Sequence, residues 1–303
     1  MRQAAGQLWQ LARTHVRLLP EEITNRRPFD LLMQPATLLD QPRAIGSAMV
    51  SSKLRDGRSC IDGLRQSGAL KLLFPRNNDL LETTLINTAG GITGGDRFEV
   101  AATARTGSRL TLTTQAAERA YRAQAGQVGR VRTRLTVEGD GQMQWLPQET
   151  ILYDACALSR RLDVTLSDQG RFLMVEPVLF GRQAMGEEPR SILFRDHVSI
   201  RQAGSLIYRD GVTFDGDAAA ALDRPAIGGG ARAMANLVLV APEAEGLLPM
   251  IRETFGATGG ASLLANGLLV ARLLASDGFE LRQRMIPVLE QLTHHKLPAT
   301  WRL

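Results

Sequence analysis

The sequence predicts a mostly β fold that is rich in antiparallel pairs, with a few helices towards the C-terminus. Short segments alternate apolar and polar residues, and turn signals separate them at intervals typical of all-β proteins. Helical periodicity is found mainly in the last quarter of the chain. This periodicity alone does not distinguish a sandwich, a barrel and a β-helix.

The clearest strand patterns lie in the middle of the chain. Residues 131–137 and 162–166 alternate strictly, which predicts strands with one solvated face. Glycine-containing turns at 139–141 and 168–170 follow these strands. A further strand pair is expected over residues 198–208, where Gly204 marks the turn.

Two helices are expected near the C-terminus. One covers residues 243–254, after a short strand at 237–240, and the other covers residues 280–295. Pro287 lies inside the second helix and implies a kink or a later start, because proline lacks the backbone N–H.

The chain of 303 residues is long enough to bury a sizeable core. We expect residues 41–303 to form a single domain. Residues 1–40 are expected to be either a flexible extension or the product of a mis-assigned start, in which case Met33 is the true first residue.

The composition bears on partners and compartment. The net charge is +5, and all but three of the 36 basic residues are arginine. No basic block with interleaved aromatic residues is present, so nucleic acid is not an expected partner, whereas acidic protein partners remain plausible. No apolar run reaches the roughly eighteen residues needed to cross a membrane. Cys60 and Cys156 are far apart and indicate a reduced, cytoplasmic chain.

The histidines do not form an evident metal cluster. His294 and His295 are neighbours, so on a helix they point in different directions. A solvated helix end is the better interpretation of that pair, and His197 is expected to pack or to pair with a carboxylate. The roles of all three stay open.

The most unusual segment covers residues 87–96 and contains two glycine pairs, Gly90-Gly91 and Gly94-Gly95. Glycine pairs occur where the backbone needs a positive φ or where another group approaches it closely. A phosphate loop is excluded, because no Gly-Lys-Ser/Thr follows and the spacing is not G-x-G-x-x-G. Taken by itself, the segment predicts a turn between two strands.

Two further polar motifs follow. Residues 113–122 read Thr-Thr-Gln-Ala-Ala-Glu-Arg-Ala-Tyr-Arg, and residues 145–154 read Trp-Leu-Pro-Gln-Glu-Thr-Ile-Leu-Tyr-Asp. The motif residues that we single out are Thr113, Thr114, Gln115, Trp145, Pro147 and Gln148.

Carboxylates accompany the three motifs. Asp96, Glu149 and Asp154 are candidate ligands of a transient metal path, because carboxylate oxygens can hold a divalent ion loosely while it keeps water. Structural roles are the alternative: Asp96 would cap a turn, Gln115 would tie strands together, and Glu149 would pair with an arginine.

In this order the three motifs resemble the UreD family of urease maturation, whose members carry "N-T-A-G-G-x-x-G-G-D", "T-T-Q-A-A-x-x-x-Y-R" and "W-L-P-Q-E-x-I" runs. Residues 73–76, Leu-Phe-Pro-Arg, and residues 181–187, similar to the family's "G-R-x-A-x-G-E", support the resemblance. It extends from about Gln41 to Leu303. Residues 297–301 depart from it, since many members have an arginine after the proline.

The resemblance implies an elongated, β-helix-like scaffold that is not an enzyme. Such a protein would bind UreF directly, the GTPase UreG through UreF, and apo-urease, in a 2:2 assembly with UreF. Nickel would pass through an internal water-filled conduit, with no cofactor held tightly. The alternative is a hydrolase or lyase that uses Glu149 and Asp154 as an acid/base pair. Their spacing of five residues would put them on opposite faces of a strand, which counts against this alternative.

Overall fold

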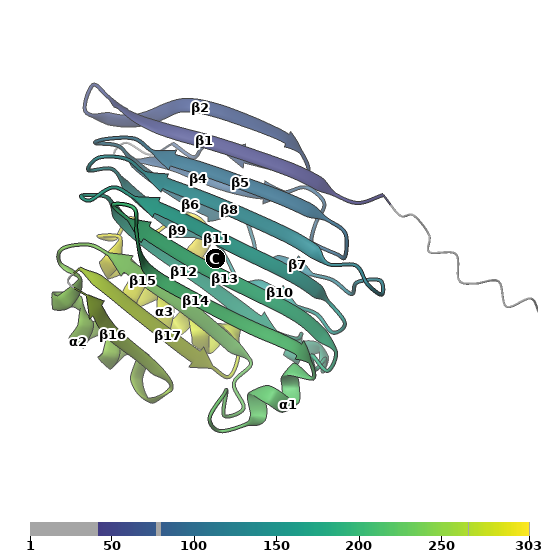
Figure 1. Ribbon diagram of the computed structural model, residues 1–303. Helices are drawn as coiled ribbons and strands as arrows, with labels where there is room; N and C mark the ends of the chain where they lie inside the picture. Colours follow the sequence, from purple (N-terminus) through teal and green to yellow (C-terminus); the bar gives the residue numbers. More distant parts are fainter. Residues whose placement is uncertain (1–41, 77–79, 266, 303) are drawn as a thin grey trace, which may run out of the picture. The chain divides into compact units, whose positions relative to one another are not determined.

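Two β-sheets face each other across the interior of the protein from Pro42 onward (Figure 1). The computed structural model describes residues 42–76, 80–265 and 267–302. Sheet A contains, from edge to edge, β14 (Ser205–Gly216), β13 (Ile192–Gln202), β11 (Ala157–Leu166), β8 (Gly129–Val137), β5 (Arg97–Ala104), β1 (Ile45–Arg55) and β2 (Arg58–Gly68).

Sheet B is the second of the two facing sheets. It contains, in order, β16 (Gly259–Ala265), β17 (Leu268–Ala275), β15 (Ala233–Val240), β12 (Arg171–Phe180), β9 (Gln142–Leu146), β6 (Arg109–Thr114), β4 (Leu81–Asn87) and β3 (Leu70–Leu73). Two short strands, β10 (Thr150–Leu152) and β7 (Glu118–Ala120), extend it beside β12.

The chain winds through the two sheets as stacked coils. Strands β5, β8 and β11 of sheet A are followed in the sequence by β6, β9 and β12 of sheet B, and strands of successive coils pair in parallel. Antiparallel pairs close the ends of both sheets, for example β1 with β2 and β15 with β17. The expectation of a mostly β, β-helix-like scaffold is confirmed, with parallel pairing in its middle and antiparallel pairing at its ends.

The glycine turns connect the two sheets. Strands β8 and β9 flank the turn at 139–141, yet β8 pairs with β5 and β11, while β9 pairs with β6 and β12. The turn at 168–170 joins β11 to β12 in the same way. The alternation of apolar and polar residues shows which face of a strand is buried. It does not determine which other strand that strand pairs with. The strand pair at 198–208 does form as expected, as the β13–β14 hairpin.

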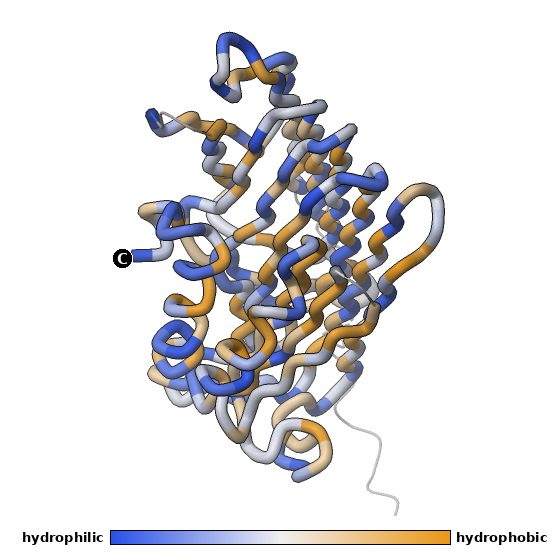
Figure 2. Tube along the Cα trace, turned by 90° about the vertical axis from the view of Figure 1, so that its left-hand side faces the viewer, coloured by the Kyte–Doolittle hydropathy of each residue, from blue (hydrophilic) through white to orange (hydrophobic). Residues whose placement is uncertain are grey.

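Two hydrophobic cores hold this architecture. One lies between the sheets and includes Phe98, Trp145 and Phe172. The other lies between sheet B and the helices α2 (Ala244–Phe255) and α3 (Gly278–Leu292). Strand β15 is buried along its whole length because both of its faces are covered. Figure 2 shows the alternation of hydrophobic and hydrophilic residues along the strands.

The two expected helices are present. Helix α3 starts at Gly278, capped by Asp277, whose carboxylate accepts a hydrogen bond from the Glu280 backbone N–H (2.8 Å). It therefore has no late start, and Pro287 lies within it. Helix α1 (Ala218–Asp223) and three 3-10 turns, η1 (Gln183–Met185), η2 (Gly256–Thr258) and η3 (Ala299–Arg302), complete the structure. No described helix is both long and apolar enough to cross a membrane. The expectation for residues 1–40 lies outside the described residues.

Candidate functional site

The three sequence motifs lie side by side, because each occupies the same place in successive coils. Sheet B is interrupted there. Before the interruption Leu85 pairs with Thr114, and Thr113 pairs with Leu146. Beyond it Ala120 pairs with both Ile92 and Leu152. The motifs are thus three stacked irregular segments, which we call the break.

Glycine is required at several positions of the first motif. Gly90 and Gly95 have φ angles of 77° and 91°, which side chains rarely adopt. A Cβ on Gly91 would lie 2.2 Å from the Tyr121 ring, and one on Gly94 would lie 2.8 Å from the Gln127 carbonyl oxygen. The close-approach interpretation therefore holds for the inner pair of glycines, Gly91 and Gly94.

Asp96 ends the first motif and fixes it to the first strand of sheet A. Its buried carboxylate accepts hydrogen bonds from the backbone N–H groups of Ala44 and Thr93, both at 2.8 Å. The turn-capping role considered for Asp96 is what the structure shows. A metal-binding role for this carboxylate stays a prediction.

The second motif is tied to both of its neighbours. The Gln115 backbone N–H donates to the Leu85 carbonyl (3.0 Å), and the Thr114 hydroxyl accepts from the Gln148 backbone N–H (2.9 Å). The Thr113 and Thr300 hydroxyls are hydrogen-bonded at 3.1 Å. Gln115 therefore ties the strands together through its backbone N–H group.

The third motif is held by an arginine from α3. Arg282 binds the Glu149 carboxylate through two nitrogens, with N–O distances of 2.5 and 2.8 Å, and it also donates to the Gln148 side chain. Its guanidinium lies over the Trp301 ring, whose Nε1 donates to the Leu146 carbonyl (2.9 Å). The ion pair considered for Glu149 is thus present.

Asp154 has a separate set of partners. Its carboxylate accepts from the backbone N–H groups of Arg190 and Ser191 (both 2.9 Å). Glu149 and Asp154 are thus held by different partners, Arg282 for the first and backbone N–H groups for the second. Their use as an acid/base pair stays an untested alternative.

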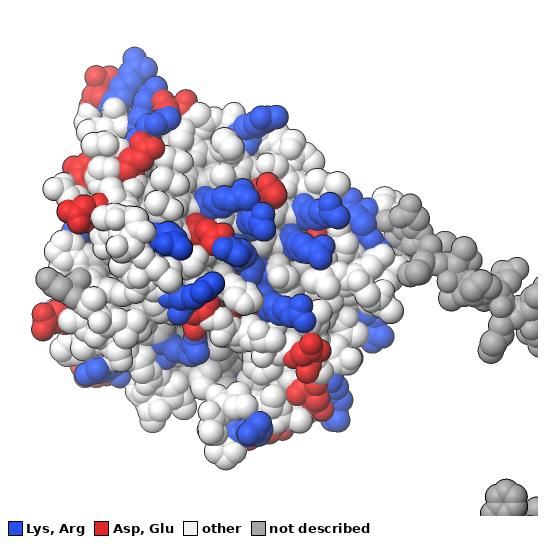
Figure 3. Space-filling model, viewed as in Figure 1, with Lys and Arg blue, Asp and Glu red and all other residues white. Residues whose placement is uncertain are grey.

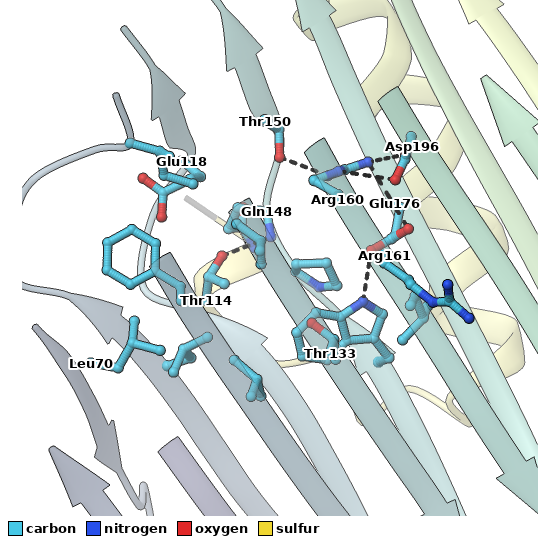
Figure 4. A pocket seen from close by; sticks show the side chains of 18 residues that line it. Leu70, Thr114, Glu118, Thr133, Gln148, Thr150, Arg160, Arg161, Glu176 and Asp196 are labelled. Carbon is cyan, nitrogen blue, oxygen red and sulfur yellow. Dashed lines mark hydrogen bonds and ion pairs between the residues drawn. The ribbon is translucent and has the colours of Figure 1, made fainter. Parts of the chain in front are cut away.

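Behind the break lies a cavity of about 80 Å³ between the two sheets, enough for a few water molecules (Figure 4). Its floor is apolar, with Phe98, Val100 and Leu162 among the lining residues. Polar side chains from several elements also line it: Thr114, Glu118, Thr133, Gln148, Thr150, Arg160, Glu176 and Asp196. Trp145 and Pro147 of the third motif lie in the same wall.

A buried charged cluster occupies one end of this cavity. Arg160 donates to both oxygens of Asp196 and to the Thr150 hydroxyl (2.9 Å). Its guanidinium lies 4.0 Å from the Glu176 carboxylate, which also accepts from Trp145 Nε1 (3.0 Å). Burial raises the pKa of Glu176, with Asp196 adding to the rise, against the opposing effects of Arg160 and Trp145.

Glu118 lies at the other end of the cavity (Figure 4). It also lines a second pocket, of about 190 Å³, beside Asn87, Gly90 and Gln115. Burial raises the pKa of Glu118, although hydrogen bonds from the Asn87 side chain (3.1 Å) and the Arg119 backbone oppose the rise. Glu118 therefore borders both the internal cavity and the outer pocket.

Sequence reasoning missed the cluster of Arg160, Glu176 and Asp196, as well as Arg282. A signal was present for two of them. Arg160 stands at an inward position of its strand between Leu158 and Leu162, and Asp196 stands likewise between Phe194 and Val198. A charge in a buried row needs a partner inside the protein, so each predicts the other.

The remaining candidates lie outside the break. His197 is exposed on sheet A, and His294 and His295 follow the end of α3 with positive φ angles. Cys156 is buried, which raises the pKa of its thiol to about 12. Across the described ranges, no group of three or more His, Cys, Asp or Glu side chains is placed to hold a metal ion.

Comparison with known proteins agrees with the motifs. A family described as UreD urease accessory protein matches residues 44–302. The urease accessory protein UreD of Roseobacter denitrificans is 59% identical over 90% of this chain and all of its own length. Those of Ruegeria sp. (strain TM1040) and Ruegeria pomeroyi are 52% and 48% identical, over 86% and 83% of this chain and 91% and 98% of their own lengths. This chain therefore belongs to the UreD family of urease accessory proteins.

Proposed function

We propose that this chain is a non-enzymatic maturation factor that lets nickel reach apo-urease through the cavity behind the break. The observation that carries the proposal is the break itself. Three irregular segments, the first of them rich in glycine, interrupt sheet B at one place, and a cavity with carboxylates at both ends lies behind them. Such an interruption costs sheet hydrogen bonds, which a purely structural wall would keep.

The donor set suits a passing divalent ion. Carboxylate, hydroxyl and carbonyl oxygens bind such an ion without the closed shell of cysteine or histidine ligands that would retain it. Glu118 and Glu176 face the cavity. Burial raises the pKa of each, because the charged carboxylate is poorly solvated there, so a cation that binds beside it would stabilise the charged form. Nickel is the cargo in this proposal, and the protein holds no cofactor tightly.

The three carboxylates that the sequence suggested as metal ligands already have partners within the protein. Asp96, Glu149 and Asp154 already accept hydrogen bonds or an ion pair from the protein, so nickel would have to displace those partners. Glu118 also accepts hydrogen bonds, from the Asn87 side chain and the Arg119 backbone N–H, but of these four carboxylates it is the one that lines the cavity. We propose that Glu118 makes the main contribution to the path, while the other three keep the break in shape.

The proposed partners follow from the family. The chain would bind UreF directly and UreG through UreF, in a 2:2 assembly with UreF, and the assembly would dock on apo-urease in the cytoplasm. GTP hydrolysis would belong to UreG, because this chain has no Gly-Lys-Ser/Thr phosphate loop. The purified protein is accordingly expected to hydrolyse no GTP.

The test is the nickel content of urease. Cells carrying Glu118→Gln are expected to yield urease with several-fold less nickel in nickel-limited medium, because an amide attracts a divalent ion less than a carboxylate does. Glu176→Gln should act in the same direction. Glu253→Gln, an exposed substitution on α2, is the matched control and should leave the nickel content unchanged.

Nickel is measured by atomic spectroscopy of purified urease, alongside the amount of complex formed with UreF. Normal nickel content in a Glu118→Gln/Glu176→Gln double variant that still binds UreF would contradict a path through this cavity. Full nickel loading in cells that lack this chain altogether would contradict the maturation role itself.

A further inference from the structure

Helices α2 and α3 cover the outer face of sheet B, whereas no helix or strand in the described part of the chain covers the outer face of sheet A. Its outward positions on five adjacent strands carry a set of arginines that we call the basic face: Arg97, Arg130, Arg132, Arg134, Arg161, Arg195, Arg201 and Arg209. Figure 3 shows these basic side chains spread across the middle of the molecule, with few acidic ones between them.

Strand register sets the basic face out as rows. Arg97 lies opposite Arg130, and Arg132 lies opposite Arg161. Arg132 also lies opposite Glu99, and Arg134 lies opposite Asp163. Acidic residues on this face are Glu99, Asp163 and Asp215; of these, Asp163 pairs with Arg161 (2.8 Å) and Asp215 with Arg195 (3.7 Å). The other arginines of the face make no ion pair with another described residue.

Stability of the fold does not account for all of these arginines. The two arginine–arginine pairs place like charges directly opposite each other on neighbouring strands, which destabilises a sheet, and the core lies on the other side of these strands. Because these like-charge pairs destabilise the sheet, we attribute the arginines to binding rather than to stability.

We propose that the basic face docks an acidic face of a partner protein. Arginine suits this role because its planar guanidinium can bind a carboxylate through two parallel hydrogen bonds and is weakly hydrated. The five strands span about 19 Å, and the rows from Arg97 to Arg201 extend about 20 Å along them. That area is smaller than a standard stable interface, so the complex is transient and sensitive to salt.

The shape of the basic face favours a protein over a nucleic acid. Its described outward positions carry no Phe, Tyr or Trp ring on which a base could stack, His197 being their one imidazole, and a flat sheet enters neither groove of a duplex. A flat array of guanidinium groups is complementary in shape and charge to a flat protein surface that carries carboxylates. The inference concerns a different surface from the cavity and does not rest on the nickel path.

The test is site-specific photo-crosslinking in the native cell. A photoreactive amino acid replaces Ser159, a neutral residue that lies between Arg130 and Arg195 in one row. The same amino acid replaces Gln291, exposed on α3, as the control. Mass spectrometry then identifies the crosslinked molecule and the segment that reacted. We expect Ser159 to capture a protein segment rich in Asp and Glu that Gln291 does not capture.

Charge reversal then tests the electrostatics. Arg132→Glu/Arg134→Glu should reduce the yield of that crosslink about tenfold, since it places like charges against the acidic segment. Arg58→Glu/Arg109→Glu changes the net charge equally at residues off the basic face and should leave the yield unchanged. Arg132→Gln/Arg134→Gln is a milder variant with an intermediate expected loss, and thermal unfolding verifies that each variant is folded.

Several outcomes would overturn the proposal. They are a crosslink to nucleic acid, a crosslink to a neutral or basic protein segment, the absence of any crosslink at Ser159, and a yield that does not respond to charge reversal. An acidic segment from a protein outside the urease system would support the basic face while separating it from the proposed function.

Discussion

The same coils build both sheets, yet one sheet is regular and the other is interrupted. In sheet A, β8 and β11 stay in register from the Leu158–Gly129 pair to the Leu166–Val137 pair. In sheet B, β12 pairs with β9 up to the Met174–Trp145 pair and then with β10 from the Val178–Thr150 pair. Residues 147–149 of the third motif lie between β9 and β10. The unbroken sheet carries most of its charges outward, with Arg160 and Asp196 as inward exceptions, and the interrupted one turns polar groups inward at the break.

This difference separates two uses of polar residues. On the outer face of sheet A the arginines are exposed, so each contributes little to stability. At the break the polar groups are buried, and each needs a partner from another coil or from α3. Substitutions at the break should therefore cost much more stability than substitutions on the outer face of sheet A.

The largest effect is expected from Arg282→Met, which leaves the Glu149 carboxylate buried without its cation. The cost should be about 3–4 kcal/mol, because breaking one side of a buried pair strands the other charge. Urea unfolding measures it. Arg284→Met on the same helix is the control and should cost less than about 1 kcal/mol, since its partner Glu280 is partly exposed and keeps its hydrogen bonds from Ser276. Equal costs for the two variants would contradict the view that the burial of Glu149 sets the size of the loss.

A smaller cost, about 2–3 kcal/mol, is expected from Gly91→Ala, because the new Cβ would overlap the Tyr121 ring. Gly90→Ala meets no neighbouring atom and should cost only about 1 kcal/mol through its positive φ. Both are measured by urea unfolding. Adding Tyr121→Ala should relieve part of the Gly91→Ala cost, and strict additivity would count against the overlap.

Glu118→Gln should change how stability depends on pH. The folded pKa of Glu118 is raised, so the folded state holds its proton more tightly than the unfolded state does. Its contribution is fully present below the ordinary pKa of 4.5 and is lost as pH rises through the folded pKa. Unfolding measured from acid to neutral pH should show a flatter decline in the Gln variant. Identical profiles would indicate that Glu118 is not buried in the way described.

The smallest effect is expected from Arg134→Thr on the outer face of sheet A. The change should alter the free energy of unfolding by less than about 0.5 kcal/mol, because the side chain is exposed and makes no ion pair with a described residue. Thermal unfolding measures it. A loss comparable to that of Arg282→Met would show that the basic face has a structural role after all.

Much of the fold could be predicted because alternation is a local property. Each buried row, such as Leu162, Val164 and Leu166, can be read directly from the chain, and so can the turns that follow. The parallel pairing could not be read in this way. Partners in successive coils lie some thirty residues apart, and nothing within one strand specifies which neighbour it meets.

The sequence by itself determined the family, the strand faces, the two long helices and the positions where glycine and carboxylates are unusual. Only the tertiary structure decided that the three motifs stack into one break and that Arg282 neutralises Glu149 across 133 residues. It also decided that Arg160 meets Asp196 and that the outward arginines form one face. Register across coils brings these groups together, and a chain read one segment at a time does not carry that register.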